Sequence, residues 1–216
     1  MLQHNSFNKG AVFMIPDLPF RVALVLLAAV FLPLGAYHRI RAHTGEKIDR
    51  WQEGVFILFG LRLTAAAAFA GGMAWLINPA WMAWSHLPLP AGLRWAGVTI
   101  AFCGGFSWVW ALHHLGKNLT DTVITRRQAE LVTTGPYRWV RHPFYSSLIL
   151  VVFGVSLTTA NAFIMLMCGI VWFVFLFPRT RIEERNLVQR FGDDYRAYMR
   201  RVGRFVPRFM PQRDDT

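Results

Sequence analysis

The segment GPYRWVRHPFY, from Gly135 to Tyr145, places cations, an imidazole and aromatic rings directly ahead of an uncharged apolar run. Pro143 fits the first position of a helix, where its missing N–H costs nothing, and His142 then falls near the N-cap. The free N–H groups of that helix, its positive dipole end and Arg141 favour an anion. Four aromatic side chains offer flat surfaces to a ring: Tyr137, Trp139, Phe144 and Tyr145. The segment therefore suits a ligand with both an aromatic base and a carboxylate or phosphate, although a plain interfacial belt at a membrane boundary has the same composition.

A pair of acidic residues, Glu183 and Glu184, follows a later apolar run and stands in an arginine-rich tail. Arg179 and Arg181 are close in sequence, so a solvated helix face with ion pairs is the ordinary interpretation. The functional alternative is that one carboxylate turns inward and accepts a hydrogen bond from a ribose hydroxyl or an ammonium group. The residues alone leave both alternatives open.

A helical hairpin is expected to bring these two features together. One apolar segment runs over residues 144–157 and the next over 162–177, and only residues 158–161 join them. So short a link forces two helices to be antiparallel neighbours. The aromatic and cationic segment enters the first arm and the glutamates leave the second, so both lie at the same end of the bundle.

The composition indicates an integral membrane protein. Of 216 residues, 54% are hydrophobic and 16% are charged, whereas about 25% is typical of soluble domains. Further apolar segments at 20–37, within 55–84 and at 93–112 give an all-α, multi-pass bundle of about five transmembrane helices. The net charge of +11 comes from basic residues that flank these runs. That pattern points to membrane lipids as partners and not to nucleic acid.

The distribution of Lys and Arg predicts the orientation. The loops 38–54 and 113–143 and the tail 178–216 are basic, which places them, with the motif segment and the C-terminus, on the cytoplasmic side. Within the tail, an amphipathic helix is expected over 179–190 and a second over 194–202, with Gly192 at the C′ position of the first and Asp193 as N-cap of the second. Tyr195 and Tyr198 would share one face of the second helix.

Arg62 and the pair His113 and His114 could be given functional roles, but the sequence does not favour such roles. Arg62 lies in an apolar run, but residues 63–84 are long enough to span, so we expect a boundary residue that snorkels to the cytoplasm. His113 and His114 are neighbours and face different directions on a helix, so no metal site is expected.

The ordered set of motifs resembles the isoprenylcysteine carboxyl methyltransferase family of integral membrane enzymes, which is related to phospholipid methyltransferases. It comprises Leu115-Gly-Lys-Asn118, Gly135-Pro-Tyr-Arg138, Arg141-His-Pro-Phe-Tyr145, Glu183-Glu184, and Phe191-Gly-Asp-Asp-Tyr-Arg-Ala-Tyr198 followed by Pro207. The resemblance covers roughly residues 112–208. It divides the chain into N-terminal transmembrane helices, 1–111, and a methyltransferase module, 112–216. Ser147 stands where the family usually has glycine; serine is small, so the pocket is expected to survive, with its exact shape left open.

The resemblance implies S-adenosyl-L-methionine as methyl donor and a lipophilic or prenylated acceptor, methylated on its carboxylate. Carried over residue by residue, it implies cofactor-binding roles for Tyr137, His142, Pro143, Tyr145, Glu183 and Glu184, and catalytic roles for Arg141, His142 and Glu184. The sequence has no CxxC metal-ligand spacing, so no metal is expected. An amine acceptor would need a base, for which His142 or a glutamate is the candidate. A bacterial inner membrane is favoured over the endoplasmic reticulum, and the oligomeric state is left open.

Two alternatives remain from the sequence. Membrane sterol reductases resemble the same module and use NADPH, but they carry an Asp with a later Lys-Cys where this chain has Glu183-Glu184-Arg-Asn186. The other alternative is a non-catalytic protein that binds lipid through its basic tail.

Overall fold

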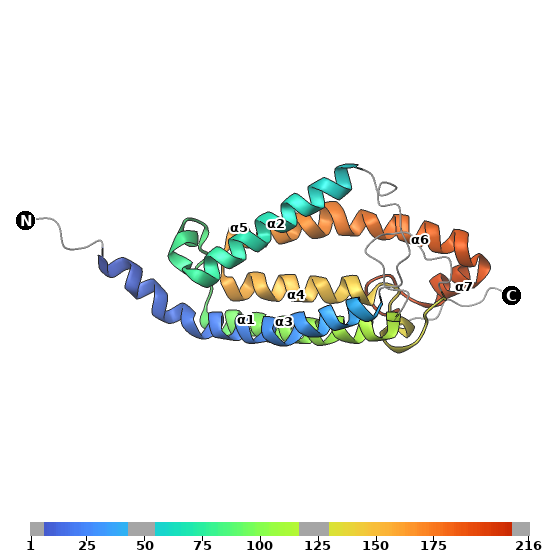
Figure 1. Cartoon of the computed structure of the whole chain (residues 1–216), viewed down its shortest axis with the longest axis horizontal. Helices are drawn as coiled ribbons and strands as arrows, with labels where there is room; N and C mark the ends of the chain where they lie inside the picture. Colours follow the sequence, from blue (N-terminus) through green and yellow to red (C-terminus); the bar gives the residue numbers. More distant parts are fainter. Residues whose placement is uncertain (1–6, 43–54, 117–129, 209–216) are drawn as a thin grey trace, which may run out of the picture.

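The computed structural model describes residues 7–42, 55–116 and 130–208, and helices dominate these ranges (Figure 1). The helices are, in chain order, α1 (Phe7–Arg41), α2 (Val55–Ile77), η2 (Pro79–Ser85), α3 (Ala91–Leu115), η4 (Gly135–Arg138), α4 (Pro143–Thr159), α5 (Ala162–Ile170), η5 (Val171–Leu176), α6 (Phe177–Phe191) and α7 (Asp193–Arg201). Asn118 and Lys117 of the first predicted motif lie outside the described residues.

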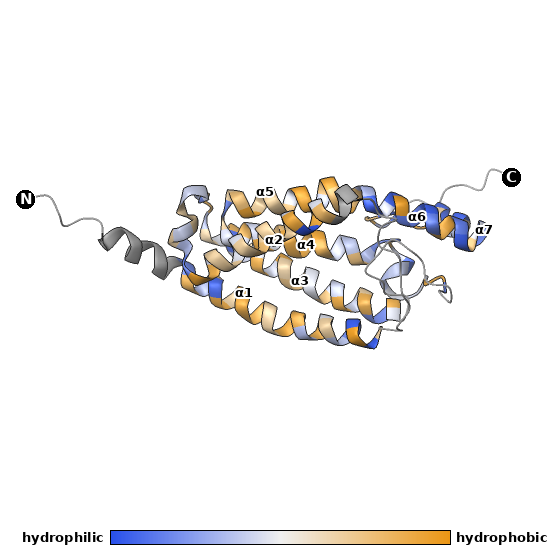
Figure 2. Ribbon diagram, turned by 45° about the horizontal axis from the view of Figure 1, so that its top comes forward, coloured by the Kyte–Doolittle hydropathy of each residue, from blue (hydrophilic) through white to orange (hydrophobic). Residues whose placement is uncertain are grey.

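The predicted multi-pass membrane fold is confirmed. Four helical stretches are long and apolar enough to cross a membrane, namely Asp17–Arg41, Phe59–Ile77, Ala91–Leu115 and Ala162–Phe191, and α4 is a shorter apolar helix. Large apolar side chains such as Leu63 and Phe173 are exposed on the outside of the bundle, as expected of a surface that faces lipid. Polar residues gather instead on α6 and α7 at one end (Figure 2).

The hairpin forms as predicted, but the link between its helices is shorter than the four residues expected. α4 continues to Thr159, Ala160 adopts a left-handed conformation with φ of 48°, and Asn161 caps α5 by accepting from the Ile164 N–H at 3.1 Å. The Asn161 amide also donates to the Met82 carbonyl at 3.0 Å, which ties the hairpin tip to η2.

Small residues let α3 and α4 pack closely. A Cβ added to Gly154 of α4 would lie 2.4 Å from the Ala101 nitrogen, and one added to Gly97 of α3 would lie 2.7 Å from the Gly154 carbonyl oxygen. Gly104 meets the α4 backbone in the same way. Because lipid supplies no hydrophobic driving force between helices, such close backbone approach is a main source of their association.

A buried ion pair holds the end of the bundle that lies opposite the polar helices. Arg94 of α3 donates to Asp17 of α1 at 2.6 Å and to the Thr158 carbonyl at 2.9 Å, and its guanidinium lies 3.9 Å from the centre of the Phe20 ring. Asp17 and Arg94 are both 6% exposed. Neither residue could be assigned a role from the sequence, because nothing local marks positions so far apart as partners.

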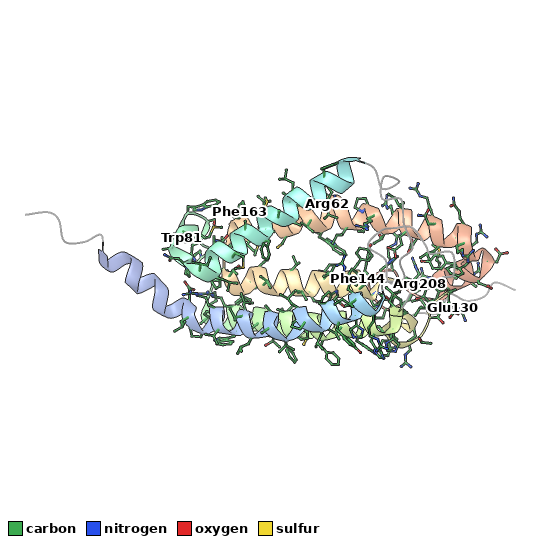
Figure 3. The ribbon with its side chains drawn as sticks, viewed as in Figure 1. Arg62, Trp81, Glu130, Phe144, Phe163 and Arg208 are labelled. Atoms are coloured by element: carbon green, nitrogen blue, oxygen red, sulfur yellow. The ribbon has the colours of Figure 1, made fainter. Side chains whose placement is uncertain are left out.

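Three predicted boundaries are wrong. The first helix begins at Phe7 and not near residue 20, and its apolar span begins at Asp17, whose charge Arg94 compensates. The second helix ends at Ile77, since Pro79 opens the short helix η2. The apolar stretch after Arg62 is therefore shorter than expected, and Arg62 lies within the span Phe59–Ile77 with an exposed side chain (Figure 3).

The third correction concerns the second arm of the hairpin, which does not stop near residue 177. α5, η5 and α6 form one continuous helix from Ala162 to Phe191, although Pro178 lacks a donor. The intervening η5 is a π-helical segment in which the Phe177 N–H donates to the Trp172 carbonyl, one residue further back than in an α-helix. Such a local adjustment satisfies backbone groups around a membrane proline. The predicted tail helix 179–190 is therefore the end of this arm.

The second tail helix is confirmed as α7, with one difference at its start. Gly192, with φ of 57°, stands at the N-cap position, and Asp193 is already the first helical residue. Gly192 also donates to the Val188 carbonyl at 2.9 Å, which ends α6 as the sequence predicted. The predicted division of the chain at residue 112 falls inside α3 and stays a prediction.

Candidate functional site

The motif segment enters α4 as predicted. His142 is the N-cap residue and Pro143 the first helical residue, while Gly135 has φ of 58° and allows the turn ahead of them. His142 is only 3% exposed, and Tyr145 packs its ring edge-on against the imidazole with 5.7 Å between centres. The helix dipole and its free N–H groups are thus directed at the position of His142.

Glu184 is the carboxylate that turns inward. Its Oε1 accepts from Arg141 Nε at 3.0 Å, from His142 Nε2 at 3.1 Å and from Arg204 Nε at 3.2 Å, and its Oε2 accepts from Arg204 Nη2. The residue is 4% exposed. A carboxylate buried to this degree is stable only when such donors compensate its charge, so the solvated-face interpretation fails for Glu184.

His142 lies between the two acids. Its Nε2 faces Glu184, and its Nδ1 lies 4.0 Å from Glu183 Oε2, too far for a hydrogen bond. The Glu183 side chain is 29% exposed, yet its Oε2 is buried and has no hydrogen-bond partner among the described residues. The hairpin therefore brings residues 142, 183 and 184 together as predicted, and leaves one carboxylate oxygen available to accept a hydrogen bond.

Arg141 donates hydrogen bonds to several partners. Besides Glu184, its Nη1 donates to the carbonyls of Met199, at 3.1 Å, and Val202. These are carbonyls at the C-terminal end of α7, where a cation is favoured by the helix dipole. Arg141 thus fastens α7 to the motif segment in this structure, and its predicted hold on a ligand carboxylate stays a prediction.

The chain beyond α7 returns to the motif and pairs with it, which the sequence analysis did not foresee. Arg141 N–H donates to the Gly203 carbonyl at 2.8 Å and His142 N–H to the Arg204 carbonyl at 3.0 Å, as a short parallel bridge. The Phe205 ring lies 5.9 Å from the His142 ring. It also lies 5.4 Å from the Trp172 ring. We call residues 202–205 the return segment.

Three buried tyrosines join α7 to the motif. Tyr195 and Tyr198 share one face of α7, as predicted, with ring centres 5.8 Å apart. Tyr198 donates its hydroxyl to the Tyr137 carbonyl at 2.5 Å. Burial raises the pKa of Tyr137, Tyr195 and Tyr198 above the usual value, so all three phenols stay neutral and act as donors or apolar surface.

Ser147 stands at the position where the resembled family usually has glycine. Ser147 is 1% exposed and donates its hydroxyl to the Pro143 carbonyl at 2.7 Å. This carbonyl belongs to the first turn of α4, so the serine is satisfied within its own helix. The structure gives Ser147 a local role and does not show how it affects a ligand.

A groove of about 480 Å³ opens beside Glu184 along α6. Its lining includes Arg181, Glu184, Arg185, Val188, Met199 and Arg204. Of the predicted site residues, only Glu184 lines this groove. We call it the arginine groove.

Comparison with known proteins places the same region in a family context. The profile of the phospholipid methyltransferase family matches residues 93–194. The protein-S-isoprenylcysteine O-methyltransferase of Saccharomyces cerevisiae is 29% identical over 113 residues, which cover 51% of this chain and 47% of the yeast protein. Methanethiol S-methyltransferase 1 of Bradyrhizobium diazoefficiens is 35% identical over 71 residues, 33% of this chain and 24% of that relative.

The fold has a solved counterpart. A eukaryotic intramembrane Ras methyltransferase, isoprenylcysteine carboxyl methyltransferase, superposes with a TM-score of 0.53 at 20% identity, covering 86% of this chain and 67% of the other. The matches to the curated relatives span about half of their length or less. The resemblance predicted from the ordered motifs is thereby confirmed for the fold and for the C-terminal half of the sequence.

Proposed function

We propose that this protein is an integral membrane methyltransferase that uses S-adenosyl-L-methionine and acts on a lipophilic, prenylcysteine-like acceptor at its carboxylate. The observation that carries the proposal is the convergence of His142, Glu183 and Glu184 at the polar end of a membrane hairpin. The profile of the phospholipid methyltransferase family matches residues 93–194, which include these three residues.

The residues present fit such a cofactor. Glu183 Oε2 is a buried acceptor without a partner among the described residues, and it is suited to an ammonium group or a ribose hydroxyl. The His142 and Tyr145 rings next to it offer aromatic surface to a base. When bound, the cofactor supplies a methyl group on a positively charged sulfur.

The roles of the chain's own residues follow from this geometry. We assign His142, Pro143, Tyr145, Tyr137 and Glu183 to binding the cofactor. Glu184 fixes the imidazole of His142 through its 3.1 Å contact and anchors Arg141. A carboxylate acceptor is already ionised at neutral pH, so the site needs no strong base. Its work is to align the reactants and exclude water, which contributes on the order of 7–11 kcal/mol in well-oriented reactions.

The competing functions lack support from the relatives reported above. All of them are methyltransferases, which favours methyl transfer over NADPH-dependent reduction and over lipid binding without catalysis. We place the site on the cytoplasmic side of the membrane, because the basic segments surround it. A bacterial inner membrane remains the favoured location.

The decisive test measures ligand binding to the purified protein and does not depend on turnover. Isothermal titration of the purified protein in detergent should show binding of S-adenosylhomocysteine and none of NADPH. Glu183→Gln and His142→Ala should weaken that binding, whereas Arg200→Gln, an exposed change on α7, should not. Tight NADPH binding without any response to S-adenosylhomocysteine would overturn the proposal.

Turnover then identifies the acceptor. The protein is incubated with methyl-labelled S-adenosyl-L-methionine and a total lipid extract or a prenylcysteine. A base-labile labelled ester is expected. A base-stable product would show an amine or sulfur acceptor instead and would refute the carboxylate assignment.

A further inference from the structure

The arginine groove contains more positive charge than the protein itself neutralises. Of its three arginines, Arg204 alone pairs with a carboxylate of the described residues, that of Glu184. Arg181 and Arg185 are exposed and one helical turn apart on α6. The contact found for Arg181 is with the Phe177 ring, 5.5 Å from its centre, and no acidic partner is found for Arg185 in the described part of the chain. The groove therefore presents two cations to whatever enters it.

The remaining lining of the groove is partly apolar. Besides its charged residues, the groove is lined by Val188 and Gln189 of α6 and by Met199 of α7. Glu184 does not cancel the field, because Arg141, His142 and Arg204 already surround its carboxylate. Two guanidinium groups next to apolar side chains suit an anion that carries an apolar body.

The position of the arginine groove along the α5–α6 arm places it at the level of the lipid headgroups. Trp81 and Trp84 of η2 are exposed, and Figure 3 shows Trp81 beside Phe163 of α5. The Trp84 ring packs on the Phe163 ring with 5.6 Å between centres, as in an interfacial aromatic belt. From Ala162 at that level, a rise of about 1.5 Å per residue brings the helix to Arg181 after about 29 Å. The hydrocarbon core of a bilayer is about 30 Å thick. Arg181 and Arg185 thus lie at the level of the headgroups on the other side.

We propose that the arginine groove binds the phosphate of an anionic phospholipid from the surrounding leaflet, with Arg181 and Arg185 as the ligands of that phosphate. The lipid is a separate ligand and not the methyl acceptor. Its chains would follow the exposed apolar surface of the α5–α6 arm, and its headgroup would occupy the space between α6 and α7.

The proposal is tested by lipid retention, without cofactor or turnover. The protein is reconstituted in nanodiscs of phosphatidylcholine with a minor fraction of phosphatidylglycerol, and native mass spectrometry counts the lipids that stay bound on release. We expect phosphatidylglycerol to be retained in preference to phosphatidylcholine. The double variant Arg181→Gln/Arg185→Gln should lower that preference about 30-fold, since each arginine near an anionic surface contributes about a factor of five.

Matched variants make the result specific. Arg200→Gln/Arg201→Gln removes the same charge from the exposed end of α7 and should leave the preference within about twofold. Arg181→Lys/Arg185→Lys keeps the charge and should retain most of it. An equal loss in both glutamine variants would show diffuse attraction and overturn the site.

Two further experiments test whether the bound anion is a phospholipid, a soluble phosphate or the cofactor. Inorganic phosphate at millimolar concentration should not displace retained phosphatidylglycerol, and its displacement would refute a lipid site in favour of a soluble phosphate site. Displacement by S-adenosylhomocysteine would assign the groove to the cofactor and would also overturn the proposal. Neither result depends on whether the protein transfers methyl groups.

Discussion

Replacing Glu184 by glutamine tests the structural account of the site most directly. The change keeps the size of the side chain but removes the charge that Arg141, His142 and Arg204 share. One of its two carboxylate oxygens becomes a donor and would face the donors of a guanidinium. Removing one partner of a buried ion pair costs about 3–5 kcal/mol. Because the Arg204 side chain is 27% exposed, solvent screens its share, and we take the lower end, about 3 kcal/mol.

The loss should spread to the tail, since Arg141 also holds the Met199 and Val202 carbonyls. For a chain of this size, about 1 kcal/mol shifts the unfolding midpoint by roughly 2–4 °C, so a decrease of roughly 6–12 °C is expected for Glu184→Gln. The measurement is thermal unfolding in detergent, followed by tryptophan fluorescence. Hydrogen exchange should in addition show lost protection in the return segment.

Glu183→Gln is the matched control. Glu183 Oε2 has no hydrogen-bond partner among the described residues, so its loss should change stability by no more than about 0.5 kcal/mol. It should nevertheless weaken S-adenosylhomocysteine binding. The reasoning is refuted if Glu184→Gln keeps its midpoint and its protection, or if Glu183→Gln is equally destabilised.

Three further predictions follow from contacts elsewhere in the chain. Gly154→Ala should lower the free energy of unfolding by about 1–3 kcal/mol, because its Cβ would lie 2.4 Å from a backbone nitrogen of α3. Gly169→Ala, which has open space around it, should be neutral or stabilising, and equal effects of the two changes on the unfolding midpoint would contradict the packing described. Asp17→Asn should cost about 3 kcal/mol in detergent, since it leaves the buried Arg94 without its ion pair, and an unchanged midpoint would show that the pair is dispensable. Tyr198→Phe should cost about 1 kcal/mol at neutral pH. Because burial raises the pKa of Tyr198, its contribution is complete below about pH 10 and is lost as pH rises through the folded-state value, so the wild-type protein should lose more stability in base than the variant does.

The membrane hairpin and the meeting of its two ends could be predicted from the sequence, because they depend on local signals. Pro143 fixes the start of α4, and the short polar link near Asn161 forces the return of the chain. Once these are set, His142 and the glutamates must lie at one end. Which glutamate turns inward could not be predicted, since neighbouring residues differ only by a rotation of about 100° that depends on the exact phase of α6.

The rest of the site depends on contacts between distant segments that no local pattern marks. Arg204 meets Glu184 only because α7 folds back, and the sequence shows no periodicity over residues 202–205. Asp17 and Arg94 are partners across 77 positions of the chain. The second arm continues beyond the predicted end at residue 177, because a π-helical segment accommodates the donor that Pro178 lacks, and this adjustment has no local signal in the sequence.

The pairing of the return segment with the motif also has a consequence for biosynthesis. The backbone partners of Arg141 and His142 are Gly203 and Arg204, which the ribosome adds only after Phe191, the last residue of the second arm. The motif segment therefore cannot complete its backbone hydrogen bonds until these late residues have emerged. A chain that ended before Gly203 would lack both backbone acceptors and would leave the N–H groups of Arg141 and His142 without these partners.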